Sequence, residues 1–395
     1  MKYVIVQGDG MADHPQPKLS GKTPLEAAKT PNMDTIASTG SLGRVNTIPT
    51  DLPPGSAVGN MSLMGLNPER YYTGRAPLEA RGLGVDVEEN DIAFRCNLVK
   101  FSKSGNRKTM KDYSGGNPTR REAESYVKLL DENIGGNEFR FYQGVSYRNL
   151  LLWKGGRTKV DYEDIHLTPP HDITGEPIEE SLPRGAGSDL LRGIQEQAEK
   201  VLCKHGNSGN GIWLWGQGIG PEVPTLKERY GLGGTVISAV GLVKGLGIYS
   251  GLISAEVEGA NGNIDTNYEG KVNAAKDSLT DGSLVFLHIE APDEASHKGN
   301  LELKLEAIER IDQRILGPLI KHLESNNQGA LLLVTDHITG LESGTHERGS
   351  VPFAIFRTST KNENIDRSFS ERCSNETGIN FPRGYELIDF FLSEG

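Results

Sequence analysis

Side chains that bind divalent metal ions follow three apolar runs of this sequence. They are Asp9, Asp293, His297, Asp336, His337 and His346. Carboxylate and imidazole groups accept manganese, zinc, cobalt or magnesium, although the histidines make magnesium at both positions a poorer match. Six such ligands are enough for two ions that share one site, as in enzymes that move phosphoryl groups. The residue types therefore predict a dimetal site for phosphoryl chemistry.

The three positions differ in how strongly each indicates a metal ligand. Asp9 precedes a glycine and by itself is typical of a turn. Asp293 and His297 share one face of a helix through their four-residue spacing, but a capping carboxylate and an exposed histidine would give the same pattern. Asp336 and His337 directly follow an apolar run, and such a pair at a strand tip is a poor way to fill a core. The set as a whole favours a metal site.

A hydroxyl group that can act as a nucleophile lies in the loop Pro53–Met61. Ser56 follows a rigid Pro-Pro-Gly sequence and precedes an expected helix start. A helix N-terminus offers backbone N–H groups to a phosphate, and a metal ion beside a hydroxyl activates it as a nucleophile. Taken alone, Ser56 is more simply explained as the N-cap of that helix.

The candidate residues must be positioned by an α/β fold. Short apolar runs that suit buried parallel strands cover Tyr3–Gln7, Gly211–Trp215, Thr235–Val240, Leu284–Ile289, Leu331–Thr335 and Pro352–Phe356. Helical patterns cover Asn32–Thr39 and Leu301–Leu323, and Pro318 should bend the second helix. This alternation predicts an open, mostly parallel sheet flanked by helices. Sites in such sheets lie at the carboxyl ends of the strands.

The stretch 92–210 differs in composition from the rest of the chain. It is richer in charged and turn residues and has fewer long apolar runs. We therefore expect a smaller α+β domain over 92–210, inserted into a discontinuous core domain formed by 1–91 and 211–395.

Composition and charge exclude several classes of protein. The 395 residues carry 42 Lys and Arg against 53 Asp and Glu, a net charge of −11, which argues against non-specific binding of nucleic acid. No apolar run approaches the roughly 20 residues of a membrane span, and the first residues match a strand better than a signal peptide. We therefore expect a cytoplasmic protein. Its glycine-rich segments fit neither the P-loop nor the dinucleotide-binding pattern.

Six motifs occur along nearly the whole chain in an order that one known family shares. They are Asp9-Gly10-Met11, Thr30-Pro31-Asn32-Met33-Asp34, Gly55-Ser56 with Val58 and Asn60, Tyr72-Thr73-Gly74-Arg75, Pro292-Asp293-Glu294-Ala295 with His297, and Asp336-His337 with His346. Together they resemble the archaeal-type cofactor-independent phosphoglycerate mutases of the alkaline phosphatase superfamily. That family interconverts 3-phosphoglycerate and 2-phosphoglycerate through a phosphoserine, with two divalent ions and a substrate-gripping domain inserted in its core.

The resemblance implies a role for each candidate residue. Ser56 would be the nucleophile. One ion would be held by Asp9, Ser56, Asp336 and His337, and the other by Asp293, His297 and His346. The substrate would be a small phosphorylated anion, and its binding residues would be Arg75, Arg81, Arg95, Asp112, Arg148 and His171. The inserted domain would act as a lid that keeps water from the phosphoserine.

Three segments depart from the family pattern. Ala57 replaces the usual acidic residue after the serine, Leu66-Asn67-Pro68 replaces Tyr-Asp-Pro, and Asp112–Gly116 replaces a basic segment. These departures concern the substrate more than the metal site. Two alternatives therefore stay open: a phosphatase or other phosphotransferase on the same site, such as the homoserine kinase proposed for bacterial relatives, and a metal-binding protein without turnover.

Overall fold

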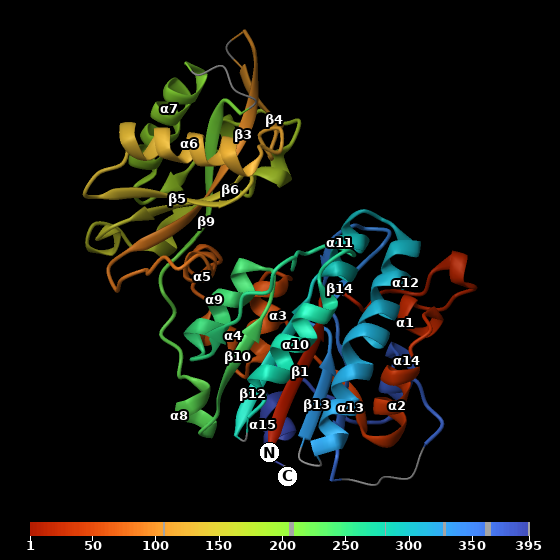
Figure 1. Cartoon of the computed structure of the whole chain (residues 1–395). Coiled ribbons are helices and arrows are strands. Elements are labelled where there is room, and N and C mark those ends of the chain that lie inside the picture. The colour runs from red at the N-terminus through yellow and green to blue at the C-terminus, as the bar shows by residue number, and fades with distance from the viewer. Residues whose placement is uncertain (106, 205–208, 281, 327–328, 360–364, 394–395) are drawn as a thin grey trace. The chain divides into compact units, whose positions relative to one another are not determined.

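The computed structural model describes residues 1–105, 107–204, 209–280, 282–326, 329–359 and 365–393, and the chain divides into two compact units (Figure 1). The larger unit comprises Met1–Tyr72 and Glu222–Gly395, and the smaller unit is Thr73–Pro221. The sequence pattern placed the divisions at 92 and 210 instead. The smaller unit extends further in both directions because α5 (Ala76–Gly82) and β9 (Gly211–Gly218) pack with β3 (Ile92–Ser104).

The larger unit is built on an eight-stranded sheet. Its strands, in spatial order, are β11 (Ile253–Ser254), β10 (Gly233–Ile237), β12 (Ser283–Ile289), β1 (Lys2–Gly8), β13 (Gly329–Val334), β16 (Val351–Arg357), β2 (Ser41–Val45) and β17 (Asn380–Phe381). The first five strands run parallel, and β16 runs antiparallel to both of its neighbours. The predicted mostly parallel α/β sheet is thus confirmed.

The two faces of this sheet are covered by different helices, which the alternation of side chains along β1 makes clear. Val4 and Val6 belong to a core shared with four helices, α2 (Pro31–Thr39), α10 (Tyr268–Ser278), α12 (Leu301–Arg310) and α13 (Gly317–Asn326). Tyr3 points to the other face, where Phe391 of α15 (Leu387–Ser393) packs edge-on against it at 5.6 Å between ring centroids. Asp9, which follows β1, lies on this second face by the same alternation.

The helical stretch after residue 300 departs from the sequence expectation. The bend was predicted at Pro318, but a π-helical turn, Ile311–Leu316, separates α12 from α13 one residue before Gly317. Pro318 lies in the first turn of α13, directly after that π-helical turn. The turn also carries the buried Asp312, whose carboxylate accepts a hydrogen bond from the backbone of Met33 at 2.8 Å.

The smaller unit is an antiparallel sheet with two helices on one face. Its strands are β3, β4 (Arg107–Asp112), β5 (Phe139–Val145), β6 (Arg148–Trp153) and β9, and its long helices are α6 (Arg120–Asn133) and α7 (Ser188–Cys203). Phe94, Cys96 and Leu98 pack against these helices. The intervening residues of β3, including Arg95 and Asn97, therefore face the opposite side.

Shorter elements complete the two units. They are α1 (Pro24–Ala27), α3 (Ser56–Leu63), α4 (Pro68–Tyr71), α8 (Leu226–Tyr230), α9 (Gly241–Tyr249), α11 (Ala291–His297), α14 (Glu371–Glu376), β7 (Ile165–His166), β8 (Arg184–Gly185), β14 (Ile338–Thr339) and β15 (His346–Glu347). Among the described residues, no helix has the length and apolar character needed to cross a bilayer.

Candidate active site

The metal-ligand candidates gather where three adjacent parallel strands of the larger unit end. Asp9 follows β1, and Asp336 and His337 follow β13. Asp293 and His297 lie on α11, which starts two residues after β12. His346 opens β15, which pairs with β14 and returns the loop to the same place. The carboxyl ends of parallel strands thus bring together residues that lie more than 300 positions apart.

The first group of ligand atoms surrounds Ser56. Nε2 of His337 lies 3.3 Å from Oδ1 of Asp9 and 3.2 Å from Oδ2 of Asp336. Oγ of Ser56 lies 3.3 Å from Oδ2 of Asp9 and 3.2 Å from Nε2 of His337. The ligand atoms of Asp9, Asp336 and His337 all lie within 4.8 Å of one another, which is the spacing that one ion needs.

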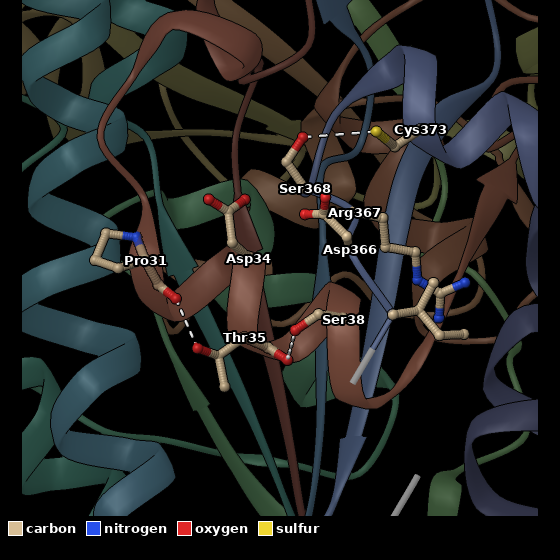
Figure 2. Close-up of a pocket in the computed structure, with 9 residues that line it drawn as sticks. Pro31, Asp34, Thr35, Ser38, Asp366, Arg367, Ser368 and Cys373 are labelled. Atoms are coloured by element: carbon tan, nitrogen blue, oxygen red, sulfur yellow. Dashed lines mark hydrogen bonds between the residues drawn. The ribbon is translucent and has the colours of Figure 1, made fainter. Parts of the chain in front are cut away.

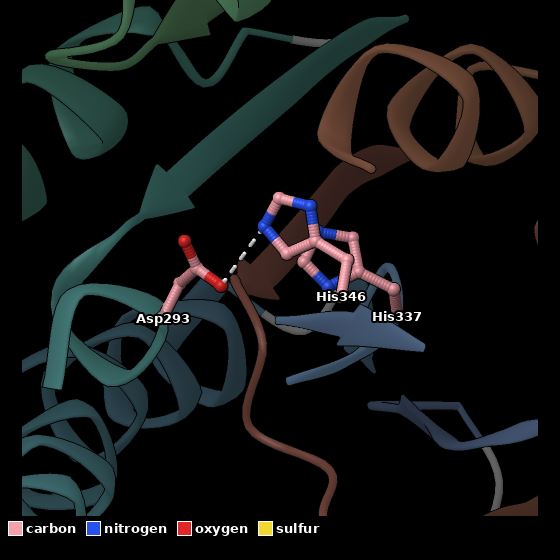
Figure 3. Close-up of side chains that lie close together, drawn as sticks. All are labelled: Asp293, His337 and His346. Carbon is pink, nitrogen blue, oxygen red and sulfur yellow. Dashed lines mark ion pairs between the residues drawn. The ribbon is translucent and has the colours of Figure 1, made fainter. Parts of the chain in front are cut away.

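The second group adjoins the first through His337, as Figure 3 shows for Asp293, His337 and His346. Nε2 of His346 lies 3.5 Å from Oδ1 of Asp293, and Nε2 of His297 lies 3.1 Å from Oδ2 of the same residue. The two Nε2 atoms of His297 and His346 are 3.1 Å apart. This distance fits a hydrogen bond between the two rings in the protein alone, and it also leaves both nitrogens able to ligate one metal ion.

Hydrogen bonds at Nδ1 orient two of these histidines. Nδ1 of His297 donates to the backbone oxygen of Gly344 at 2.7 Å. Nδ1 of His337 lies 3.1 Å from Oγ1 of Thr339, whose own hydroxyl donates to Asp293 at 2.6 Å, so Nδ1 is the donor. With Nδ1 as the donor, the neutral form of each ring has its lone pair on Nε2, which is the form that binds a metal ion. In the protein alone, the contact with Asp293 raises the pKa of His297 to about 9, so an ion would displace a proton there.

The electrostatics of the site call for a cation. Burial raises the pKa of Asp9 well above its ordinary value, and the charges of Asp336, Asp293 and Glu290 raise it further. Oδ1 of Asp9 is buried and has no hydrogen-bond partner among the described residues, although Nε2 of His337 lies nearby. Burial also lowers the pKa of His337, which keeps the ring neutral and able to ligate. The residues present thus fit bound divalent ions.

Ser56 is not the N-cap of its helix. The N-cap of α3 is Gly55, whose φ of 156° favours glycine and whose Cβ would stand 3.3 Å from Nδ1 of His346. Ser56 is the first helical residue, so its hydroxyl is available to the cluster instead. Asn60, one turn later, donates from Nδ2 to the backbone oxygen of Ser56 at 2.9 Å and to Oδ2 of Asp336 at 3.1 Å. The helix start and the metal ligands are therefore held as one unit.

Four of the predicted substrate-binding residues gather in the smaller unit, around Trp215. We call this set the arginine–aromatic cluster, and its members are Arg75, Arg95, Arg148, His171 and Trp215. The guanidinium of Arg95 lies 4.3 Å above the Trp215 ring, and the His171 ring is 5.4 Å from it. Tyr113 links Arg148 to this set, because its ring lies 6.2 Å from the His171 ring and 5.9 Å from the Tyr147 ring, over which the Arg148 guanidinium lies at 5.2 Å.

A partly buried carboxylate holds two of these arginines. Glu79, on α5, forms ion pairs with Nε of Arg75 at 2.8 Å and with Nε of Arg95 at 2.9 Å. Burial is the main cause that lowers the pKa of Arg95 to about 9; Glu79 opposes it, and the neighbouring Arg75 and Arg148 add to it. Arg75 and Arg95 share this one carboxylate, so an anion beside them would be favoured.

The other two predicted substrate residues make local contacts. Arg81 forms an ion pair with Asp86, in the segment after α5. The carboxylate of Asp112 accepts hydrogen bonds from the backbone of Ser114 and of Gly116, both at 2.8 Å, and thereby closes the turn after β4. Each of these contacts joins the residue to a neighbour close in the sequence.

Comparisons with known proteins identify the family. The family model for 2,3-bisphosphoglycerate-independent phosphoglycerate mutase matches residues 37–207. A protein of that name from Methanosarcina barkeri is 44% identical over 403 residues, covering 99% of each chain. The chain belongs to the 2,3-bisphosphoglycerate-independent phosphoglycerate mutase family. A probable member from Geobacter sulfurreducens is 42% identical over 99% of this chain and 100% of its own.

Solved structures agree with this family assignment. A cofactor-independent phosphoglycerate mutase from Thermoplasma acidophilum superposes with a TM-score of 0.66 at 25% identity, over 100% of this chain and 99% of that one. A protein from Pyrococcus horikoshii superposes with a TM-score of 0.81 at 26% identity, over 99% and 96%. The whole fold, including the inserted smaller unit, is therefore shared with these relatives.

Sequence reasoning missed several residues around the two clusters of this phosphoglycerate mutase family member. His288 contacts Asp9, Glu79 joins two arginines, and Trp215 supports one of them. One signal was available for His288, because it is a polar side chain inside the otherwise apolar run Leu284–Ile289. Another was the four-residue spacing of Arg75 and Glu79 on one helix.

A separate pocket of about 650 Å³ in the larger unit is not part of this site (Figure 2). Its polar groups are engaged by the chain itself: Asp34 accepts a hydrogen bond from the backbone of Phe369 at 3.0 Å, and Arg367 donates to the backbone oxygens of Ala37 and Gly40. Cys373 faces Ser368 at 3.6 Å. None of the six side chains predicted as metal ligands lines it.

Proposed function

We propose that this chain is a metal-dependent phosphoglycerate mutase that interconverts 3-phosphoglycerate and 2-phosphoglycerate without 2,3-bisphosphoglycerate. Family membership over the full length supports the reaction. The single structural observation that carries the mechanism is the position of Ser56, whose hydroxyl lies 3.2 to 3.3 Å from two predicted metal ligands at the start of α3.

We propose two ion positions. Asp9, Asp336, His337 and Ser56 would hold one ion, and Asp293, His297 and His346 the other. Bound there, a divalent ion would neutralise the crowded carboxylates and favour the alkoxide form of Ser56. The mixed ligands accept manganese, zinc, cobalt or magnesium, with magnesium the poorest match at the two-histidine position.

Ser56 would accept the phosphoryl group and return it. Its Oγ forms a bond to phosphorus as the bond from phosphorus to one glycerate oxygen breaks, and that oxygen takes up a proton. In the second half, the other glycerate hydroxyl gives up its proton and takes the phosphoryl group from Ser56. The backbone N–H groups in the first turn of α3 point toward the phosphoryl oxygens in such a geometry.

The smaller unit would bind the substrate anion. Arg75, Arg95, Arg148 and His171 supply forked donors and positive charge for a carboxylate or phosphate. Arg81 and Asp112 make local contacts instead, and the family resemblance alone supports a substrate role for them. The lid role that the family resemblance implies for this unit would also keep water from the phosphoserine, because a mutase must not hydrolyse it.

The decisive experiment measures two products at once. Metal-stripped protein is given manganese and 3-phosphoglycerate, without 2,3-bisphosphoglycerate, and both 2-phosphoglycerate and free phosphate are followed. We expect conversion that requires metal and releases almost no phosphate. Phosphate release without conversion would establish a phosphatase instead, and no turnover with retained metal binding would favour a non-catalytic protein.

The phosphoserine step has its own test. Ser56→Ala should abolish conversion while leaving the fold and the metal content intact, and Ser38→Ala, which alters a hydroxyl outside the site, should not change the rate. Retained mutase activity in Ser56→Ala would rule out the phosphoserine mechanism.

A further inference from the structure

His288 is a buried polar residue behind the metal-ligand cluster. It lies near the end of β12, is fully buried, and follows four apolar residues of the same strand. β1 and β12 pair in parallel with Gln7 opposite His288, so the His288 side chain lies on the same face of the sheet as Asp9 two residues further on. The ring is therefore placed to act on Asp9 from inside the protein.

The contacts of His288 link a serine to Asp9. Nε2 of His288 lies 2.9 Å from Oδ2 of Asp9, and Nδ1 lies 2.9 Å from Oγ of Ser238, the residue after β10. Oγ of Ser238 accepts a hydrogen bond from the backbone N–H of Val240 at 2.9 Å. The Ser238 hydroxyl proton has two acceptors within reach, Nδ1 of His288 at 2.9 Å and the backbone oxygen of Val240 at 3.4 Å, and the shorter contact makes Nδ1 of His288 the acceptor.

The position of the remaining ring proton follows from these contacts. A neutral imidazole carries one proton, and with Nδ1 accepting, that proton is on Nε2 and is donated to Asp9. Oδ2 of Asp9 is thereby fixed, whereas Oδ1 is the atom left without a hydrogen bond. The carboxylate is consequently held with one oxygen tied to the protein and the other turned toward His337.

We propose that His288 and Ser238 are positioning residues for the ion held by Asp9, Asp336 and His337. They fix the rotation of the Asp9 carboxylate, so that Oδ1 is presented to the ion without a loss of side-chain freedom on binding. This inference rests on the proposed ligand set and extends it to two residues that touch neither the ion nor the substrate.

The first test measures manganese affinity in the absence of substrate, by electron paramagnetic resonance of free Mn²⁺. His288→Leu removes the donor to Asp9 and should weaken binding roughly 10- to 100-fold, the usual cost of losing such a partner. His288→Gln places an amide N–H near the original Nε2 and should restore most of the affinity. Ser238→Ala should give an intermediate loss, and His322→Leu on α13 is the control without effect.

The second test uses the unaltered protein and does not depend on whether a variant folds. Two-bond ¹H–¹⁵N correlation spectra distinguish the two neutral histidine tautomers, and we expect the Nε2–H form for His288. An Nδ1–H form, or equal manganese affinity in the leucine and wild-type proteins, would overturn the positioning role. If the wild-type protein binds no manganese, the metal proposal itself fails, which is a separate outcome.

Discussion

The two charged clusters of this protein are assembled in opposite ways. In the larger unit, Asp9, Asp293 and Asp336 come from the ends of three parallel strands. In the smaller unit, Arg95 and Trp215 come from one face of an antiparallel sheet, beside a helix that supplies Glu79. The first arrangement gathers three carboxylates among histidines, and the second gathers arginines around one carboxylate. We infer that the first cluster is built for cations and the second for an anion.

The comparison separates catalysis from binding. Changes to the cluster at the strand ends should remove metal ions and turnover together, whereas changes to the arginine–aromatic cluster should weaken substrate binding and leave metal binding unaffected. A variant in the arginine–aromatic cluster that loses metal ions, or a variant at the strand ends that changes only substrate binding, would contradict this assignment.

The largest effect is expected from Asp336→Asn. Loss of this buried carboxylate should lower kcat by at least about 100-fold, more than the loss of a residue that only positions a ligand, and should reduce bound manganese. Asp366→Asn, an exposed position in the same unit, is the control. Full activity with reduced metal content would contradict the proposed role of the ion.

Arg95→Lys should affect substrate binding by the arginine–aromatic cluster. Lysine keeps the charge but loses the planar fork and the stacking on Trp215. We expect kcat/KM for 3-phosphoglycerate to fall roughly 10- to 100-fold, mainly through KM, with unchanged manganese binding. Arg314→Lys is a matched control, because Arg314 stacks on Tyr268 and pairs with Glu269 far along the chain in the other unit. Loss of manganese binding in Arg95→Lys would contradict the separation of substrate binding from metal binding.

Glu79→Gln tests how the smaller unit tolerates its buried positive charge. Removing the partner of the buried Arg95 should lower the free energy of unfolding by about 3 kcal/mol. Glu269→Gln removes a carboxylate from an exposed pair and should cost no more than about 1 kcal/mol. Urea denaturation of both variants gives the two values, and equal costs would mean that the Glu79 contact behaves like a surface ion pair.

The pH response of His171 reports the charge of the arginine–aromatic cluster. Burial lowers the pKa of His171, and the neighbouring Arg95, Arg75 and Arg148 lower it further while Asp172 opposes them. A bound anion favours the imidazolium, so 3-phosphoglycerate should raise the pKa of His171. Binding should therefore take up protons at pH values between the pKa of His171 in the free protein and its higher pKa in the complex. NMR titration of Ser56→Ala with and without ligand measures the shift. A downward shift, or none, would place the anion elsewhere.

The smallest effect is expected from Arg81→Ala. Its ion pair with Asp86, whose side chain is 65% exposed, is of the kind that contributes little. We expect KM for 3-phosphoglycerate to change by less than about twofold. A tenfold rise in KM would show that Arg81 binds the substrate, as the family resemblance implies.

Much of the strand-end cluster was accessible from the sequence. Asp9 and Asp336 each follow a short apolar run, and Asp293 and His297 share a helix face. These are local patterns. Because the carboxyl ends of parallel strands meet at one edge of the sheet, each pattern also predicts where the side chain lies in space. The open α/β sheet and the family resemblance followed from the same patterns.

Contacts between distant segments were decided only by the tertiary structure. β9 has the apolar pattern of a core strand, yet it pairs with β3 and belongs to the smaller unit. Arg75 and Arg81 look alike in the sequence, but one meets Glu79 and Arg95 and the other meets Asp86. His288 reaches Asp9 through the register of β1 and β12. Strand pairing and register depend on which long-range contacts form, and local residue patterns do not specify that choice.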